Sequence, residues 1–169
     1  MVIERVNGRI PILLGVGGNN TRAIVETLKN DDFTGVDAIL SVVPYYNKPS
    51  QEGIYQHYKA ISEATDLPIV LYNVPGRTGV NMKAETTLRI ARDFKNVIRQ
   101  SKSSGDITQM DDIIKNKPAN FDVISGDDGI TFPLITLGPS ALSRSSETRS
   151  RASSAVWYVW HCKGTMPMH

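Results

Sequence analysis

The chain has 169 residues, of which 40% are hydrophobic and 21% are charged, and this composition excludes disorder over most of its length. Nineteen Lys and Arg residues against seventeen Asp and Glu residues leave a formal charge of +2, which excludes a general electrostatic nucleic-acid binder. Cys162 is the only cysteine and no apolar run approaches the ~18 to 20 residues that span a bilayer. We therefore expect no disulfide framework, no cysteine zinc site and a soluble, cytoplasmic protein.

Short apolar runs rich in Val, Ile and Leu predict five strands. Their apolarity is continuous, which is typical of parallel strands covered on both faces. The predicted strands span residues 10–16, 36–43, 68–74, 96–100 and 121–125.

A segment with helical spacing follows each of the first four runs. Residues 51–65 place Ile54, Tyr58 and Ile61 on one face, with Ser50 as the N-cap. Further helices are predicted over 21–30, 83–93 and 108–116, the last with Asp106 as its cap. This alternation favours either an open doubly wound sheet or a (β/α)8 barrel. A barrel needs eight units, and the chain offers five or six.

Polar groups at strand ends are the candidates for chemistry, because the working groups of parallel α/β folds lie there. Residues 15–20, Gly-Val-Gly-Gly-Asn-Asn, predict a tight turn rather than a dinucleotide site. Tyr45 and Tyr46, held between prolines, suit packing and catalysis equally. Tyr72 ends the third predicted strand, and Arg77 follows in a glycine-containing turn that suits carboxylate binding or is simply solvated.

Other polar residues carry weaker signals. The Ser125-Gly126-Asp127-Asp128-Gly129 stretch suits a metal, a polar substrate or a helix cap equally. We interpret His57 as a packing or surface residue within its amphipathic helix. His161 and Cys162 are adjacent, which is poor spacing for a shared metal.

Four motifs, PYYNKPSQEG, LYNVPGRTGVN, SGDITQ and VISGDD, together resemble the dihydrodipicolinate synthase family of class I aldolases, over about residues 6–138. The resemblance implies a (β/α)8 barrel that condenses pyruvate with aspartate-4-semialdehyde, on the route to diaminopimelate and lysine. The imine forms on a lysine, so no further cofactor or metal is implied.

The resemblance also implies roles for individual residues. Tyr72 is the proton-relay tyrosine, and Tyr46 completes the relay in a neighbouring subunit's site, which implies a homo-oligomer, a dimer or tetramer. Arg77 binds the substrate carboxylate, and the backbone at Gly126 holds the second substrate. Tyr45 lies where some members bind inhibitory lysine. The sister N-acetylneuraminate lyases typically lack the arginine, so Arg77 favours the synthase.

The chain departs from the family pattern at two places before residue 138. Residues 10–20 resemble the family's third strand, so we expect an incomplete barrel of roughly the third to seventh βα units, without the threonine that completes the relay. The family's imine lysine aligns with Ser101, and Lys102 stands one residue late. Because strand side chains alternate, Lys102 can serve as the catalytic amine only if the strand slips or bulges.

A third departure divides the chain into a partial barrel domain, residues 1–138, and a tail, residues 139–169, that does not match the family. Back-translating residues 144–169 with permitted codons and moving the frame by one base gives VIGNAFPREFSRMVRLALQGDYADA, which resembles the family's continuation. Codons for residues 100–102 likewise contain Ile-Lys in another frame. We interpret both departures as frame errors, one near residue 99 with recovery by about residue 104 and the other near residue 139. The remaining alternatives are a related pyruvate aldolase, such as N-acetylneuraminate lyase, and a non-catalytic fragment.

Overall fold

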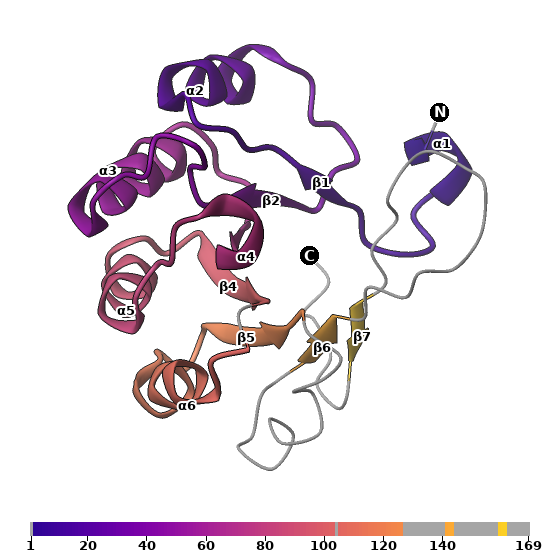
Figure 1. The fold of residues 1–169 in the computed structure, drawn as a ribbon. Helices are drawn as coiled ribbons and strands as arrows, with labels where there is room; N and C mark the ends of the chain where they lie inside the picture. Colours follow the sequence, from indigo (N-terminus) through magenta and orange to yellow (C-terminus); the bar gives the residue numbers. More distant parts are fainter. Residues whose placement is uncertain (1, 104, 127–140, 144–158, 162–169) are drawn as a thin grey trace.

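A computed structural model of the chain describes residues 2–103, 105–126, 141–143 and 159–161. Its strands form one sheet in chain order (Figure 1). The strands are β1 (Leu13–Gly15), β2 (Ala38–Val42), β3 (Ile69–Asn73), β4 (Val97–Lys102), β5 (Asp122–Ser125), β6 (Ala141–Ser143) and β7 (Val159–His161). Neighbours from β1 to β6 pair in parallel, and β7 pairs antiparallel with β6.

The unbroken strand order separates the two predicted architectures. A doubly wound sheet reverses its order at a switch point, whereas each strand here pairs with the next one along the chain. The five strands β1 to β5 with their helices are therefore part of a (β/α)8 barrel. All five predicted strands are confirmed, although β1 begins at Leu13 rather than residue 10, and β4 continues to Lys102.

The long helices lie on the outside of the curved sheet (Figure 1). They are α2 (Thr21–Asn30), α3 (Gln51–Ser62), α5 (Ala84–Asp93) and α6 (Ile107–Asn116). Of the two short helices, α1 (Val2–Val6) precedes β1 and α4 (Pro75–Thr78) follows the end of β3. The four long predicted helices are confirmed, and α3 ends at Ser62 rather than residue 65. The short helices α1 and α4 were not predicted, because one turn is too short to reveal a helical period.

Side-chain caps fix where the long helices begin. The Ser50 hydroxyl accepts a hydrogen bond from the Gly53 amide at 3.1 Å, as predicted. The Asp106 carboxylate accepts one from the Gln109 amide at 3.0 Å, which confirms the cap of α6. These bonds satisfy amide groups that the first turn of a helix leaves without partners.

The hydrophobic core lies between the sheet and these helices. Ile39, Ile69 and Leu71 are fully buried against Ile54 and Ile61 of α3 and the neighbouring helices. We call this helix-covered side of the sheet the outer face and the opposite side the inner face. Strand residues therefore alternate between the core and the inner face.

The sequence predicted strands that are covered on both faces. This prediction is confirmed for β3 but is wrong for β1 and β2. Four of the five β3 residues are buried, while alternate residues of β2 are only half-buried. Leu14 in β1 is 41% exposed. The helices cover the outer face alone, so side chains on the inner face depend on other strands for cover.

The described residues contain no helix long and apolar enough to cross a membrane. Ser104, Asp127, Asp128 and Cys162 lie outside the described residues, as do most of residues 139–169.

Candidate active site

The ends of β3, β4 and β5 bring three predicted site positions together on the inner face. Tyr72 pairs with Ser101 in the register of β3 and β4, and paired residues of parallel strands point to the same face. Their neighbours Leu71 and Asn73 lie on the outer face, where Leu71 joins the core. Tyr72, half-buried, and Ser101 therefore face the barrel interior.

Gly126 completes this group from the end of β5. Its amide donates to the Lys102 carbonyl at 2.8 Å. A Cβ atom at Gly126 would clash with the Ser103 hydroxyl oxygen, and it would lie 3.4 Å from the Lys102 carbonyl oxygen and 3.5 Å from Ser101 Oγ. The Ser103 side chain fills the space that a side chain at position 126 would need, so the Gly126 backbone packs directly against the end of β4, beside Ser101.

Lys102 lies on the opposite face of β4. It pairs with Asn73, whose side chain bonds the backbone of Met82 on the helix side of the sheet. The only shift in the β3–β4 register lies earlier, between Ile69 and Val70, and pairing is regular from Arg99 to Lys102. The one-residue displacement from Ser101 therefore points the amine away from Tyr72.

The surroundings of Lys102 perturb its amine. The side chain is fully buried, and Nζ has no hydrogen-bond partner among the described residues. Burial lowers the pKa of Lys102 to about 8, and the nearby Asp106 carboxylate opposes this shift. The amine therefore loses its proton at a lower pH than an exposed lysine does, but it contacts neither solvent nor the inner face.

Gln100 shares the outer face of β4. It pairs with Leu71 and is fully buried. Neither its Oε1 nor its Nε2 has a partner in the described part of the chain. An apolar side chain would suit this position, because buried polar atoms without hydrogen bonds are costly.

Arg77 lies on α4, the single turn that follows β3. Pro75 is suited to start that turn, and Gly79 ends it with a φ of 70°, a conformation that favours glycine. The buried Thr78 hydroxyl donates to the carbonyls of Val74 and Val80. Arg77 itself is exposed at the carboxyl end of the strand that carries Tyr72.

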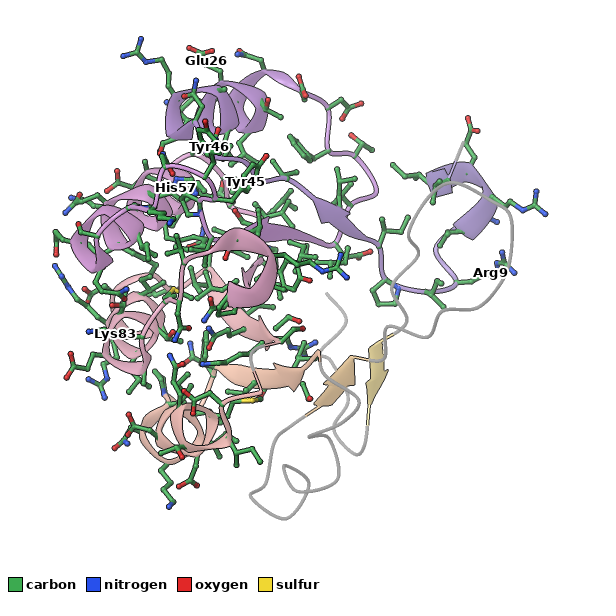
Figure 2. All side chains as sticks on the ribbon, in the orientation of Figure 1. Arg9, Glu26, Tyr45, Tyr46, His57 and Lys83 are labelled. Carbon is green, nitrogen blue, oxygen red and sulfur yellow. The ribbon has the colours of Figure 1, made fainter. Side chains whose placement is uncertain are left out.

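The two adjacent tyrosines lie on the loop after β2 (Figure 2). Tyr46 is 88% exposed and has a φ of 72°, while Tyr45 is 43% exposed. A positive φ is uncommon for a residue other than glycine. Neither phenol belongs to the core of the described residues, so packing within that part of the chain does not account for the pair.

The glycine-rich turn after β1 approaches β2 closely. A Cβ atom at Gly17 would lie 3.0 Å from the Val42 amide nitrogen, which confirms the tight-turn interpretation. The Asn20 side chain then caps α2 by accepting from the Ala23 amide. A cavity of about 480 Å³ beside this turn lies between β1 and α2.

His57 packs between α3 and α2, as predicted (Figure 2). It is 3% exposed, and its Nδ1 lies 2.8 Å from the Thr21 hydroxyl. Burial lowers the pKa of His57 to about 4, so the ring is neutral at pH 7. Among the described residues, no three His, Cys, Asp or Glu side chains gather closely enough to hold a metal ion.

The sequence prediction missed the polar side chains behind the site. Asn73, Gln51 and Gln109 all bond to the segment that joins α4 to α5. Each belongs to one of the motifs that carry the family resemblance, which was the available signal. A pattern of residue types does not show which polar side chains meet.

Comparison with known proteins gives concordant matches. The model of the Dihydrodipicolinate synthetase family matches residues 1–156, past the boundary expected at residue 138. The chain is 85% identical over 138 residues to the 4-hydroxy-tetrahydrodipicolinate synthase of Phocaeicola vulgatus, which covers 82% of this chain and 46% of the relative. It is 80% identical to that of Parabacteroides distasonis, with the same coverage.

A solved structure agrees with these matches. The chloride-inhibited dihydrodipicolinate synthase from Acinetobacter baumannii, complexed with pyruvate, superposes with a TM-score of 0.76 at 46% sequence identity. The match covers 82% of this chain and 47% of that chain. The chain spans about half the length of the curated relatives that it matches. Its sequence and its fold both show that it belongs to the dihydrodipicolinate synthetase family.

Proposed function

We propose that the inner-face site at the ends of β3, β4 and β5 is built for the condensation of pyruvate with aspartate-4-semialdehyde through a Schiff base. The observation that carries this proposal is the pairing of Tyr72 with position 101, beside Gly126. A proton-transferring phenol thereby faces the position where the family resemblance expects the imine lysine. Pyruvate bound to the Acinetobacter baumannii relative supports the choice of keto acid.

The reaction assigns a distinct task to each group. A lysine amine adds to the ketone of pyruvate and loses water to form an imine, which then loses a methyl proton to become a nucleophilic enamine. Tyr72 transfers protons at these steps, as a positioned acid and base. Arg77 holds the carboxylate of the aldehyde substrate through its fork of N–H donors.

Tyr46 supports a proposal about the oligomeric state. Its phenol is almost wholly exposed on a single chain, and a neighbouring subunit's site would give it a place. We therefore propose a homo-oligomer in which Tyr46 reaches the neighbour's relay, with the cytoplasm as the location. Gly126 contributes its backbone to the second substrate.

The chain as written lacks an amine on the inner face at this point. Ser101 stands there, and Lys102 forms the imine only if β4 shifts by one residue. In the frame-shifted reading, Ile and Lys stand at positions 100 and 101, and each side chain would suit the face of β4 on which it lies. This reading places an apolar side chain where the Gln100 amide has no described partner, and an amine beside Tyr72.

Borohydride trapping with pyruvate tests this assignment. We expect no adduct on the chain as written and an adduct on residue 101 of the Ser101→Lys, Lys102→Ala double variant, located by peptide mass spectrometry. The Lys102→Ala single variant is the matched control. An adduct on Lys102 of the unaltered chain would show that β4 shifts, and no adduct on the double variant would contradict the inner-face site.

The orientation of Lys102 also favours a second candidate, a non-catalytic chain that acts by binding alone. It predicts no adduct on any variant. A related lyase, such as an N-acetylneuraminate lyase, would instead trap pyruvate. It would differ in its aldehyde partner, which turnover measurements on the trapping-competent variant distinguish.

A further inference from the structure

Three polar side chains hold the segment Asn81–Lys83, which we call the 81–83 segment. The first is Asn73, fully buried at the end of β3. Its Nδ2 donates to Asn81 Oδ1 and to the Met82 carbonyl, each at 3.0 Å. Its Oδ1 accepts from the Met82 amide at 3.3 Å. One side chain thus bonds both backbone groups of Met82.

The second side chain is Gln51, the first residue of α3. Its Nε2 donates to the Asn81 carbonyl at 2.9 Å. Its Oε1 accepts from the Lys83 amide at 3.0 Å and from the Thr86 hydroxyl at 2.7 Å. Figure 2 shows Lys83 at the start of α5. Gln51 therefore ties the 81–83 segment to the helix that follows the Tyr45–Tyr46 loop.

The third side chain is Gln109 in the first turn of α6. Its Nε2 donates to the Met82 carbonyl at 2.7 Å, and its Oε1 accepts from Asn81 Nδ2 at 3.1 Å. The 81–83 segment is thus bound to β3, α3 and α6. Motif residues from three separate stretches of the sequence meet here.

These bonds close the loop that carries Arg77. The chain leaves β3 at Asn73, passes through α4, and returns to the same Asn73 side chain at Met82. Met82 is fully buried, so this end of the loop cannot move without disturbing the core. Asn73 also follows Tyr72 directly, so one residue fixes both the strand end below Tyr72 and the return of the Arg77 loop.

We propose that Asn73 is a positioning residue, assisted by Gln51 and Gln109. Its bonds fix the position of α4, and therefore the position of the Arg77 side chain relative to Tyr72. This inference rests on the carboxylate-binding role proposed for Arg77. A leucine at position 73 would preserve much of the volume but leave the Met82 amide and carbonyl with fewer partners inside the core. The end of the Arg77 loop at Met82 would then no longer be held against β3, and the Arg77 guanidinium would no longer be held in one position.

The matched control for Asn73 is Asn96, near the amino end of β4. Its Nδ2 donates to the carbonyls of Ser62 and Thr65 at 3.0 and 2.9 Å. Asn96→Leu therefore removes two bonds from a half-buried asparagine at the opposite end of the sheet. Both leucine variants should destabilise the protein, but only Asn73→Leu should affect the loop of Arg77.

Amide hydrogen exchange supplies the first measurement. In Asn73→Leu we expect the Gly79 and Met82 amides to exchange about tenfold faster than in the unaltered chain, after correction for global stability. We expect no such change in Asn96→Leu. Gln109→Leu removes the two bonds of the Gln109 amide and should give a smaller increase in the exchange rate of these amides. This variant replaces Asn73→Leu in the test if Asn73→Leu does not fold. Unchanged exchange at these amides in both Asn73→Leu and Gln109→Leu would overturn the inference.

Binding of succinate semialdehyde, followed by NMR titration, supplies the second measurement. We expect Asn73→Leu and Arg77→Gln each to weaken binding about tenfold, and Asn96→Leu to bind as the unaltered chain does. Equal binding by the two leucine variants would overturn the positioning role. If Arg77→Gln binds as well as the unaltered chain, the proposed role of Arg77 fails, and the exchange measurement alone decides whether Asn73 fixes α4.

Discussion

At the scale of single residues, His57 links burial to the pH dependence of stability. Its pKa is about 4 in the folded chain because burial disfavours the charged ring, against about 6.5 in an unfolded chain. Between these values the unfolded state binds more protons, so the free energy of unfolding falls as the pH drops from about 6.5 towards 4.

We predict that His57→Gln flattens this fall. The unaltered chain should lose about 3 kcal/mol over that pH range from this residue alone, and the variant should lose less by about that amount. Urea denaturation at pH 7, 5.5 and 4.5 measures both curves. Acidic residues such as Asp32, whose pKa is lowered by Thr34, affect both proteins equally. Parallel curves would contradict the assignment.

Lys102 gives a prediction of the same kind at alkaline pH. Its amine is fully buried without a described hydrogen-bond partner, and burial lowers its pKa to about 8. Holding the charged amine inside the fold costs free energy below pH 8, and this cost disappears as the pH rises through the unfolded value of about 10.4.

We therefore expect Lys102→Met to raise the free energy of unfolding by about 1–3 kcal/mol at pH 7. The gain should shrink between pH 8 and 10.5, as the amine of the unaltered chain loses its proton. Denaturant titrations at pH 7 and 10.5 provide the test, with Lys115→Met as the control for an exposed lysine. A gain that persists at pH 10.5 would point to packing rather than to charge.

At the scale of elements, the outer face of β4 carries an uncompensated polar side chain. Gln100 pairs with Leu71 on the core side of the sheet, and neither of its amide atoms has a described partner. We predict that Gln100→Ile stabilises the chain by about 1–3 kcal/mol, because it replaces buried unpaired polar atoms with an apolar side chain. Thermal unfolding of this variant beside Gln51→Ile tests it, since Gln51 has partners for both amide atoms and its loss should destabilise. Destabilisation by both changes would contradict the prediction.

Helices and strands followed from local patterns wherever those patterns were long enough. The apolar spacing of Ile54, Tyr58 and Ile61 and the cap at Ser50 predicted α3, and the structure has both. The predicted end of β4 at residue 100 was too early, because pairing with β3 and β5 extends the strand through polar residues that lack strand propensity.

Local sequence patterns predicted only part of the candidate site. Tyr72 and Arg77 stood out through their motif and their strand-end position. The pairing of Tyr72 with Ser101 depends on the register shift between Ile69 and Val70, which no local pattern reveals. The bonds from Asn73 to Met82 depend likewise on how separate elements pack.

At the scale of the whole molecule, the barrel and the last residues of the chain follow different rules. Strands β1 to β6 pair in parallel, as a (β/α)8 barrel requires, whereas β7 pairs antiparallel with β6. The family match runs to residue 156 and so includes the first part of the segment that we interpret as frame-shifted. An antiparallel strand has no place in this barrel. That residues 144–169 are read in a shifted frame stays our hypothesis.

Peptide mass mapping of the protein from its natural host tests this interpretation directly. We expect a tryptic peptide that contains Val-Ile-Gly-Asn-Ala-Phe-Pro-Arg and, from β4, a peptide that ends in Ile-Lys. The printed sequence predicts instead the tryptic peptide of residues 152–163, ASSAVWYVWHCK. Detection of that peptide, together with one ending in Gln-Ser-Lys at Lys102, would show that the chain is made as written. The exposed inner face beside β1 and β2 would then belong to a protein that cannot form the imine without a shift of β4.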